Sequence, residues 1–204
     1  MPRSALFTRE EIVRAGFDLV RRKGAESLSA RELGKVLGSS SRPIFTVFKN
    51  MEEVRHEVRE ESKRWLGSYM ADVTDYTPAF KEYGMRLIKL AKDEEHLFRF
   101  LFLDKDTPQD PIAPIVITCT DAMEKEYGIT HEDVQILHYQ CWIYTCGLAI
   151  QVNTGSVEYS EEQISELLAR QFVSNLYFIK SGKKLPLVMP HLRGEDDITL
   201  KIDM

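Results

Sequence analysis

The sequence predicts an all-helical protein, because helix-start patterns recur along its 204 residues while the alternating pattern of strands is rare. Capping boxes, in which a Ser or Thr is followed three residues later by Glu or Gln, occur at Thr8, Ser29 and Ser160. Apolar residues follow each box at intervals of three and four, as on one face of a helix. These signals predict about nine helices, three of them short and within residues 1–50.

The first half of the chain divides into helices at glycines and capping residues. The expected helices cover residues 8–23, 29–37, 40–48 and 50–73. Gly24 and Gly38 follow the first two, where helices commonly end, and Asn50 is placed to cap the fourth. We expect Leu33, Val36 and Leu37 to form the buried stripe of the second helix.

The second half continues the helical pattern, with one polar loop. The expected helices cover residues 80–91, 97–103, 112–127, 130–152 and 160–179. Residues 104–111 are polar and contain prolines, so they are expected to form a loop. The helix at 130–152 is apolar on nearly all faces, which predicts that other elements cover both of its sides. Residues 185–204 are expected to form either a short strand or an ordered arm.

Charge is distributed unevenly along the sequence. The whole chain has a net charge of −5, which argues against indiscriminate binding to nucleic acid. Residues 1–50, however, hold ten Lys and Arg against five Asp and Glu, so this front segment is basic while the remainder is acidic. The distribution indicates either chance or a small nucleic-acid-binding module joined to a body that does not bind.

Composition predicts a cytoplasmic protein with no membrane segment. No apolar run approaches the roughly 20 residues that span a bilayer. The first residues, MPRSALFTREE, lack the apolar core of a signal peptide. Three cysteines fit a reducing compartment better than a disulfide framework.

The sequence contains no recognisable catalytic or cofactor-binding motif. A nucleophile elbow, a P-loop and a dinucleotide-binding glycine pattern are all missing, so we expect neither an enzyme nor a cofactor. His138 and Cys141 share a helical face but lack further ligands, so no metal site is expected. Cys141 and Cys146 point apart and cannot form an undistorted disulfide. A redox-sensing thiol at Cys119 or Cys146 is an alternative.

The stretch LGSSSRPIFTVFK, residues 37–49, has the pattern of a helix that presents a polar face. On a helix, Ile44, Val47 and Phe48 share one face and point inward. The serines are expected to cap this helix, and Pro43 is tolerated in its first turn. The free N–H groups at such a helix start favour a phosphate. Together with residues 29–37 and the turn at Gly38, this stretch predicts a helix-turn-helix.

Residue chemistry assigns roles on this polar face. Arg42 can offer two parallel hydrogen bonds to a guanine edge, while Arg31 and Lys49 are placed for phosphate contacts. The expected DNA-binding residues are Arg31, Ser39, Ser40, Ser41, Arg42, Pro43, Phe45, Thr46 and Lys49. The alternative is a structural helical hairpin whose polar face is only solvated.

Residues 8–54 resemble the DNA-binding region of the TetR family of transcriptional repressors. In that family a helix precedes the pattern L(S/T)xRxLAxxLGVSxxxLYxHFxxKEEL. The matching positions are Leu28-Ser29, Arg31, Leu33, Leu37-Gly38, Ser40, Ile44-Phe45, Phe48-Lys49, Glu53 and Val54. The resemblance implies a dimeric repressor that binds double-stranded, palindromic operator DNA.

Four positions depart from this family pattern. Ser39 replaces a valine, Phe45 a tyrosine, Val47 a histidine and Met51 a lysine. The phosphate contact of the tyrosine hydroxyl is lost with Phe45. The resemblance therefore implies that phosphate contacts are weaker here, or that they shift to Ser40, Thr46 and Lys49.

The acidic remainder resembles one branch of the same family at residues 79–102 and 141–150, where Cys146 replaces a histidine before Gly147. The resemblance implies a helical domain that dimerises and binds a small effector. We expect helices 131–152 and 161–180 to form a four-helix interface with a second copy. Gly147 and Ala149 would allow close approach there.

An effector pocket is expected among the aromatic residues of this domain. The candidate ligand-binding residues are Phe98, Phe102, Met123, Tyr139, Trp142 and Tyr144. Pockets are mainly apolar, so each of these residues could instead be plain core. An effector that prefers a conformation with displaced recognition elements would release the DNA.

The expected domains are a helix-turn-helix DNA-binding domain at residues 1–50, an effector-binding and dimerisation domain at 51–182, and a tail at 183–204. The expected function is that of a sequence-specific, dimeric transcriptional regulator and repressor released by a small molecule. The alternative is a helical scaffold or small-molecule carrier that does not bind DNA.

Overall fold

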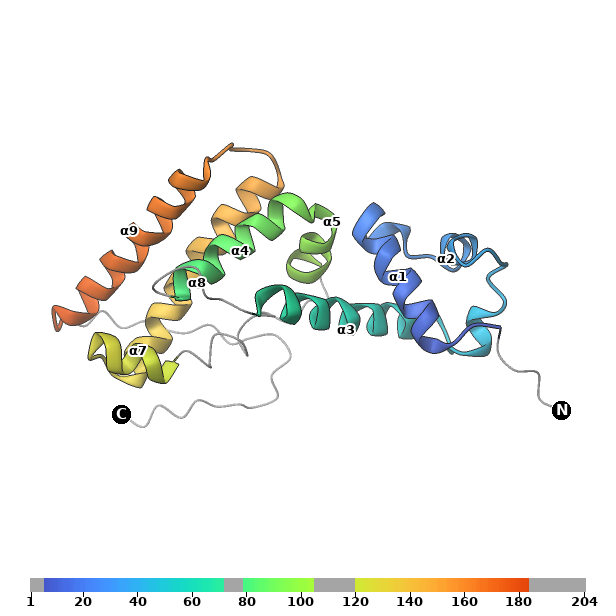
Figure 1. Ribbon diagram of the computed structural model, residues 1–204, viewed down its shortest axis with the longest axis horizontal. Helices are drawn as coiled ribbons and strands as arrows, with labels where there is room; N and C mark the ends of the chain where they lie inside the picture. The colour runs from blue at the N-terminus through green and yellow to red at the C-terminus, as the bar shows by residue number, and fades with distance from the viewer. Residues whose placement is uncertain (1–5, 72–78, 105–119, 184–204) are drawn as a thin grey trace.

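The computed structural model describes residues 6–71, 79–104 and 120–183. Within these ranges the regular elements are all helical, which confirms the predicted fold class. In Figure 1, α1 (Arg9–Lys23) and α2 (Ala30–Val36) lie at one end of the molecule, and α3 (Met51–Met70) runs from them toward the other end. None of the described helices combines the length and the apolar character needed to cross a membrane.

A second bundle forms the other end of the molecule (Figure 1). Its helices are α4 (Ala79–Asp93), α7 (Thr120–Tyr127), α8 (His131–Asn153) and α9 (Glu161–Lys180). Helix α8 packs against α4, α7 and α9. Between this bundle and α1 lie α5 (Glu95–Phe98) and the π-helical turn η3 (Arg99–Leu103).

Several predicted boundaries are corrected by the structure. Helix α3 ends at Met70 instead of Val73, which lies outside the described residues. The short helix expected at 97–103 is instead α5 followed by the π-helical turn η3. The helix expected at 112–127 is described only from Thr120, and the tail from 184 onward lies outside the described residues.

The predicted capping boxes at Thr8 and Ser160 are confirmed, whereas the one at Ser29 is only half formed. Ser29 caps α2, but the Glu32 carboxylate does not reach back to it. That carboxylate instead accepts a hydrogen bond from the Lys35 ammonium at 2.5 Å, and this bond lowers the pKa of Glu32. A nearby cation has therefore displaced the backbone partner that the pattern predicts.

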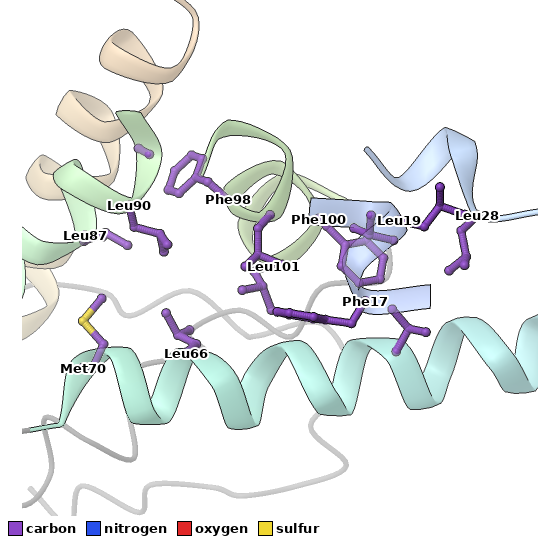
Figure 2. Close-up of a cluster of buried hydrophobic side chains, with 14 of the residues drawn as sticks. Phe17, Leu19, Leu28, Leu66, Met70, Leu87, Leu90, Phe98, Phe100 and Leu101 are labelled. Atoms are coloured by element: carbon purple, nitrogen blue, oxygen red, sulfur yellow. The ribbon is translucent and has the colours of Figure 1, made fainter. Parts of the chain in front are cut away.

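One continuous apolar core connects the two ends of the molecule, as Figure 2 shows along α3. Its central members are Phe17, Leu19, Leu28, Leu66, Met70, Leu87, Leu90, Phe98, Phe100 and Leu101. Phe98, Phe100 and Leu101 lie between the side chains of α1 and those of α4, so α5 and η3 join the two groups. A second cluster, which includes Met123, Cys141 and Phe172, lies between α7, α8 and α9.

Val36 does not belong to the buried stripe that we expected on α2. Leu33 is fully buried and Leu37 is partly buried, but Val36 is 43% exposed. Helix α2 has seven residues and packs mainly against α1, so its buried face is narrow. Leu33 and Leu37 fill that face, and Val36 lies beyond its edge.

Gly16 allows the close approach of α1 to α3. We therefore expect substitutions at Gly16 and at Val58, which faces it, to affect stability in a coupled way. A Cβ at position 16 would lie 2.6 Å from the Cγ2 atom of Val58. We therefore expect Gly16→Ala to destabilise the protein by about 1 kcal/mol, despite the better helix propensity of alanine. Urea unfolding measures this cost. In a Val58→Ala background the clash is removed, so the cost should vanish; equal costs in both backgrounds would contradict the packing.

Two arginines bridge the front helices and the second bundle. The Arg21 side chain donates two hydrogen bonds to the Glu94 carboxylate, one of them from Nε at 2.8 Å, and its guanidinium lies over the Trp65 ring. Arg59 is 5% exposed. Its guanidinium donates to Phe100 O at 2.7 Å and to Asp104 Oδ2 at 2.8 Å. These bonds fix the α5–η3 segment against α1 and α3.

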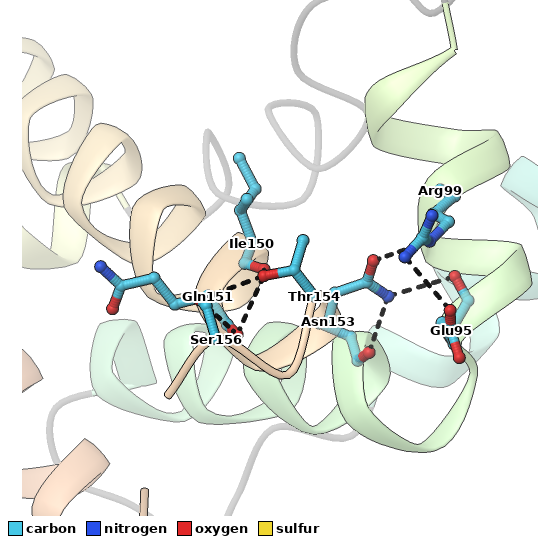
Figure 3. A network of polar contacts seen from close by, with 8 residues as sticks. Glu95, Arg99, Ile150, Gln151, Asn153, Thr154 and Ser156 are labelled. Atoms are coloured by element: carbon cyan, nitrogen blue, oxygen red, sulfur yellow. Dashed lines mark hydrogen bonds and ion pairs between the residues drawn. The ribbon is translucent and has the colours of Figure 1, made fainter. Parts of the chain in front are cut away.

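A third polar contact ties the end of α8 to the corner between α4 and α5 (Figure 3). The buried Asn153 amide donates to Ala91 O at 3.0 Å and to Glu95 O at 3.3 Å, while its oxygen accepts Arg99 Nε at 3.0 Å. Arg99 also forms an ion pair with Glu95. Helix α8 is therefore held to the same corner that carries Glu94, the partner of Arg21 on α1.

Candidate nucleic-acid interface

The candidate interface begins with α2, whose two ends are fixed by hydrogen bonds. Ser29 Oγ accepts a backbone N–H of the first turn at 3.3 Å. At the other end, Gly38 has a φ of 67° and its N–H donates to Lys35 O, while the Ser39 N–H donates to Gly34 O. These two bonds form a Schellman motif, which favours glycine at the position with positive φ. The helix therefore ends sharply and the chain turns back across it.

Gly34 allows the serines that follow α2 to lie directly against it. A Cβ at this position would lie 3.0 Å from backbone atoms of Ser39, Ser40 and Ser41. A backbone cannot move aside as the end of a flexible side chain can. Our sequence reasoning missed this role, although a glycine inside a short helix is a signal because it costs about 1 kcal/mol relative to alanine.

The recognition element, residues 41–48, contains a 3-10 turn at Ile44–Thr46 (η2) instead of the predicted α-helix. The N–H groups of residues 44 to 47 each donate to the carbonyl three residues earlier, at 3.1–3.2 Å, and Phe48 N–H then donates to Ile44 O. The expected serine cap is also wrong, since Pro43 precedes the turn and no side chain caps it. The element is short, contains proline and starts from the turn held against Gly34, and short segments commonly adopt this tighter winding.

Apolar and aromatic contacts anchor this element from behind. Ile44 and Phe48 are buried, as predicted, and Val47 is partly buried. The Arg9 guanidinium lies 4.3 Å from the centre of the Phe48 ring. Arg9 in turn forms ion pairs of about 3 Å with Glu53 and with a second glutamate on α3. The recognition element is thus held against both α1 and α3.

Glu53 fixes the end of the element through the backbone. Its carboxylate accepts the Lys49 N–H at 2.8 Å, and Asn50 Oδ1 accepts the Glu53 N–H at 2.8 Å. The bond from Lys49, followed by the bond from Arg9, lowers the pKa of Glu53. The carboxylate is therefore charged at neutral pH and holds the start of α3 beside the recognition element.

The three cations that we expected to contact DNA have no ion-pair partner among the described residues: Arg31, Arg42 and Lys49. All three are exposed. By contrast, Arg9 and Arg21 are bound by glutamates and contribute to the internal structure. The cations that the sequence assigned to DNA are thus free of ion pairs, as are Arg14, Arg22 and Lys23 on α1 among the described residues.

The other expected DNA-binding residues differ in exposure. Ser40, Phe45 and Thr46 are exposed, whereas Ser39, Ser41 and Pro43 are partly buried. The Thr46 hydroxyl donates to Pro43 O at 2.6 Å. The backbone N–H groups of Ser40, Ser41 and Arg42 have no acceptor within the described part of the chain. They leave a short run of donors beside the exposed arginine.

The six expected ligand-binding residues do not form one group. Phe98 stacks on Phe102, with ring centres 5.0 Å apart, and Phe102 lies 6.2 Å from Trp142. Met123 belongs to the separate cluster between α7, α8 and α9. Tyr139 and Tyr144 are partly buried on α8. The structure brings together the trio of Phe98, Phe102 and Trp142.

An open groove of about 930 Å³ lies elsewhere, between α4, the α8–α9 turn and the start of α9. Its walls include Arg86, Lys89, Tyr159 and Ile164, and none of the six expected pocket residues lines it. Among the described residues, no group of three His, Cys, Asp or Glu side chains could hold a metal ion.

The two described cysteines should react at different rates. Burial raises the pKa of the Cys141 thiol to about 11, an effect that a hydrogen bond from Asn175 opposes. Because the thiolate is the reactive form, Cys141 should alkylate slowly at pH 8, and the less buried Cys146 should alkylate first. Time-resolved iodoacetamide labelling with peptide mass spectrometry measures both rates. Equal rates in the folded protein, or a faster Cys141, would contradict the packing of α8 against α9.

Solved structures share this arrangement of helices. A TetR-family transcriptional regulator from Vibrio parahaemolyticus superposes with a TM-score of 0.58 at 19% identity, over 81% of this chain and 96% of that one. A transcriptional regulator from Rhodococcus sp. Rha1 superposes with a TM-score of 0.56 at 19% identity, over 84% and 97%. No protein-family model and no curated protein matches the sequence. The fold is therefore that of TetR-family transcriptional regulators.

Proposed function

We propose that the chain is a sequence-specific DNA-binding transcriptional regulator, and that it acts as a repressor. The observation that carries the proposal is that three exposed cations, Arg31, Arg42 and Lys49, lie on one helix-turn-helix surface without an ion-pair partner among the described residues. By contrast, Arg9 and Arg21 are paired with glutamates inside the fold. A double helix supplies the missing counter-charges, since each phosphate carries one negative charge.

Residue chemistry divides this surface into two functions. Arg42, at the tip of the recognition element, is placed to read a guanine edge through two parallel hydrogen bonds. Arg31 and Lys49 bind phosphates on either side and set the register of the protein on the duplex. The backbone N–H groups of Ser40 and Ser41, which have no acceptor in the described part of the chain, can donate further hydrogen bonds to a phosphate close to Arg42.

A homodimer is the second part of the proposal. Apolar side chains that belong to no internal core are exposed on α8 and α9: Ile143, Ile150, Val173 and Tyr177. Gly147 lies on the same exposed side of α8 with open space before it, which would allow a second helix to approach closely. Ala149, which we expected in this interface, is instead fully buried within its own chain. A dimer through α8 and α9 would cover the exposed residues and present two recognition elements to one duplex.

Release by a small effector is the third part. Phe98, Phe102 and Trp142 bring three aromatic rings together where α5, η3 and α8 meet. An effector there would contact η3, which a hydrogen bond from Arg59 connects to α3. It would also contact α8, which Asn153 connects to the corner between α4 and α5 that carries Glu94. An effector that binds better to a shifted arrangement of these elements would lower the affinity for DNA.

The dependence of duplex binding on salt tests the proposal against the alternative of a scaffold or carrier. If each subunit of a dimer neutralises two phosphates through Arg31 and Lys49, the logarithm of the association constant should fall with the logarithm of salt concentration with a slope of about −4. Fluorescence anisotropy with a labelled random duplex measures this slope. A protein that does not bind at about 50 mM salt is a scaffold or carrier instead.

A further inference from the structure

Phe45 is the unusual member of the candidate DNA surface. Its side chain is 46% exposed, while its neighbours Ile44 and Phe48 are buried in the core. About half of the ring is therefore left in water, on a surface that otherwise presents cations and small polar groups. Aromatic residues are enriched in binding surfaces, so this ring is available for an apolar contact in the complex.

The winding of the recognition element places Phe45 on the same side as Arg42. In a 3-10 turn, side chains three residues apart are eclipsed, and the hydrogen bond from Phe45 N–H to Arg42 O shows this winding directly. The two side chains are separated by about 6 Å along the axis of the turn. Base pairs are stacked about 3.4 Å apart, so the two residues face base pairs no more than about two steps apart.

Backbone and hydroxyl donors near Phe45 are already used within the protein. The N–H groups of residues 44 to 47 donate to the turn itself, and the Thr46 hydroxyl donates to Pro43 O. Beside the methyl group of Thr46, the Phe45 ring is therefore the large exposed group that this part of the element can offer to a base. On the base edges of the major groove, the apolar feature that such a ring can contact is the 5-methyl group of thymine.

Resting on the proposed function, we propose that Phe45 is a specificity-determining residue that contacts the methyl group of a thymine within about two base pairs of the guanine read by Arg42. Each operator half-site then contains a guanine and a thymine at this spacing. The charges of Arg42 and Lys49 bring the duplex to the surface, and the ring selects the base.

Replacing single thymines by deoxyuridine tests this proposal, because the exchange removes the methyl group and leaves the pairing unchanged. An operator selected from random duplexes with the purified full chain supplies the site. Each half-site should contain one thymine whose exchange, made in that half-site alone, weakens binding about fourfold, the value expected for one buried methyl group. Phe45→Ala should bind the thymine and deoxyuridine duplexes equally.

Val36→Ala is the matched control, since Val36 is an apolar residue of similar exposure on α2. This variant should keep the fourfold difference, and unchanged melting temperatures should show that both variants fold. A selected operator without such a thymine, or an exchange that is silent in the wild type or equally costly in Phe45→Ala, overturns the proposal for Phe45 and leaves DNA binding intact. Failure to select any operator instead overturns the proposed function.

Discussion

Arg42→Ala should weaken binding to the selected operator by about tenfold or more per half-site, because a bidentate arginine–guanine pair contributes about 1–3 kcal/mol of discrimination. Binding to random duplexes should change much less, since phosphate contacts dominate there. Competition binding against operator and random DNA measures both. The Arg42 side chain makes no contact that the fold needs, so the melting temperature should not change.

Lys49→Ala is the matched control for this prediction. It removes a phosphate contact, so it should weaken binding to operator and random DNA by the same factor and reduce the salt slope by about one per subunit. An Arg42→Ala variant that loses affinity for all sequences equally, as Lys49→Ala does, would show that Arg42 binds phosphate and reads no base.

Arg59→Ala should lower the free energy of unfolding by about 3 kcal/mol, the largest expected effect of a single substitution outside the apolar core. The substitution leaves Phe100 O without this donor inside the protein and Asp104 without its close partner, and it removes the guanidinium that lies 4.3 Å from the Phe100 ring centre. Thermal unfolding followed by circular dichroism should show a fall of roughly 6–12 °C.

Arg55→Ala is the control for Arg59, one turn earlier on the same helix. Arg55 is partly exposed and approaches the same Asp104 carboxylate at 3.8 Å, so its loss should cost less than about 1 kcal/mol. Equal costs for the two variants would contradict the role of Arg59 as the buried connection between α3 and η3.

The sequence predicted the helices and the inward residues of the recognition element for physical reasons that are local. Capping pairs are three residues apart, so Thr8 with Glu11 and Ser160 with Gln163 could be recognised directly. Ile44 and Phe48 could be placed inside because helical spacing puts both on one face.

The predictions that failed depended on contacts between distant segments. Val36 is exposed because α2 packs mainly on α1, and Ala149 is buried by its own bundle. The 3-10 winding of the recognition element follows a turn that lies against Gly34, a proximity that spacing does not reveal. The carbonyl bound by Arg59 belongs to Phe100, 41 residues away along the chain, so no local pattern could identify it.

Selection of random-sequence duplexes by the purified full chain, followed by sequencing of the bound fraction, is the most direct test of whether the surface formed by Arg31, Arg42 and Lys49 recognises DNA. We expect an enriched inverted repeat whose half-site centres lie about one helical turn apart, roughly 10–10.5 base pairs or slightly more, with a guanine in each half. The same experiment with Arg42→Ala should lose that guanine. A bound fraction as random as the starting pool would show that this surface does not recognise a DNA sequence.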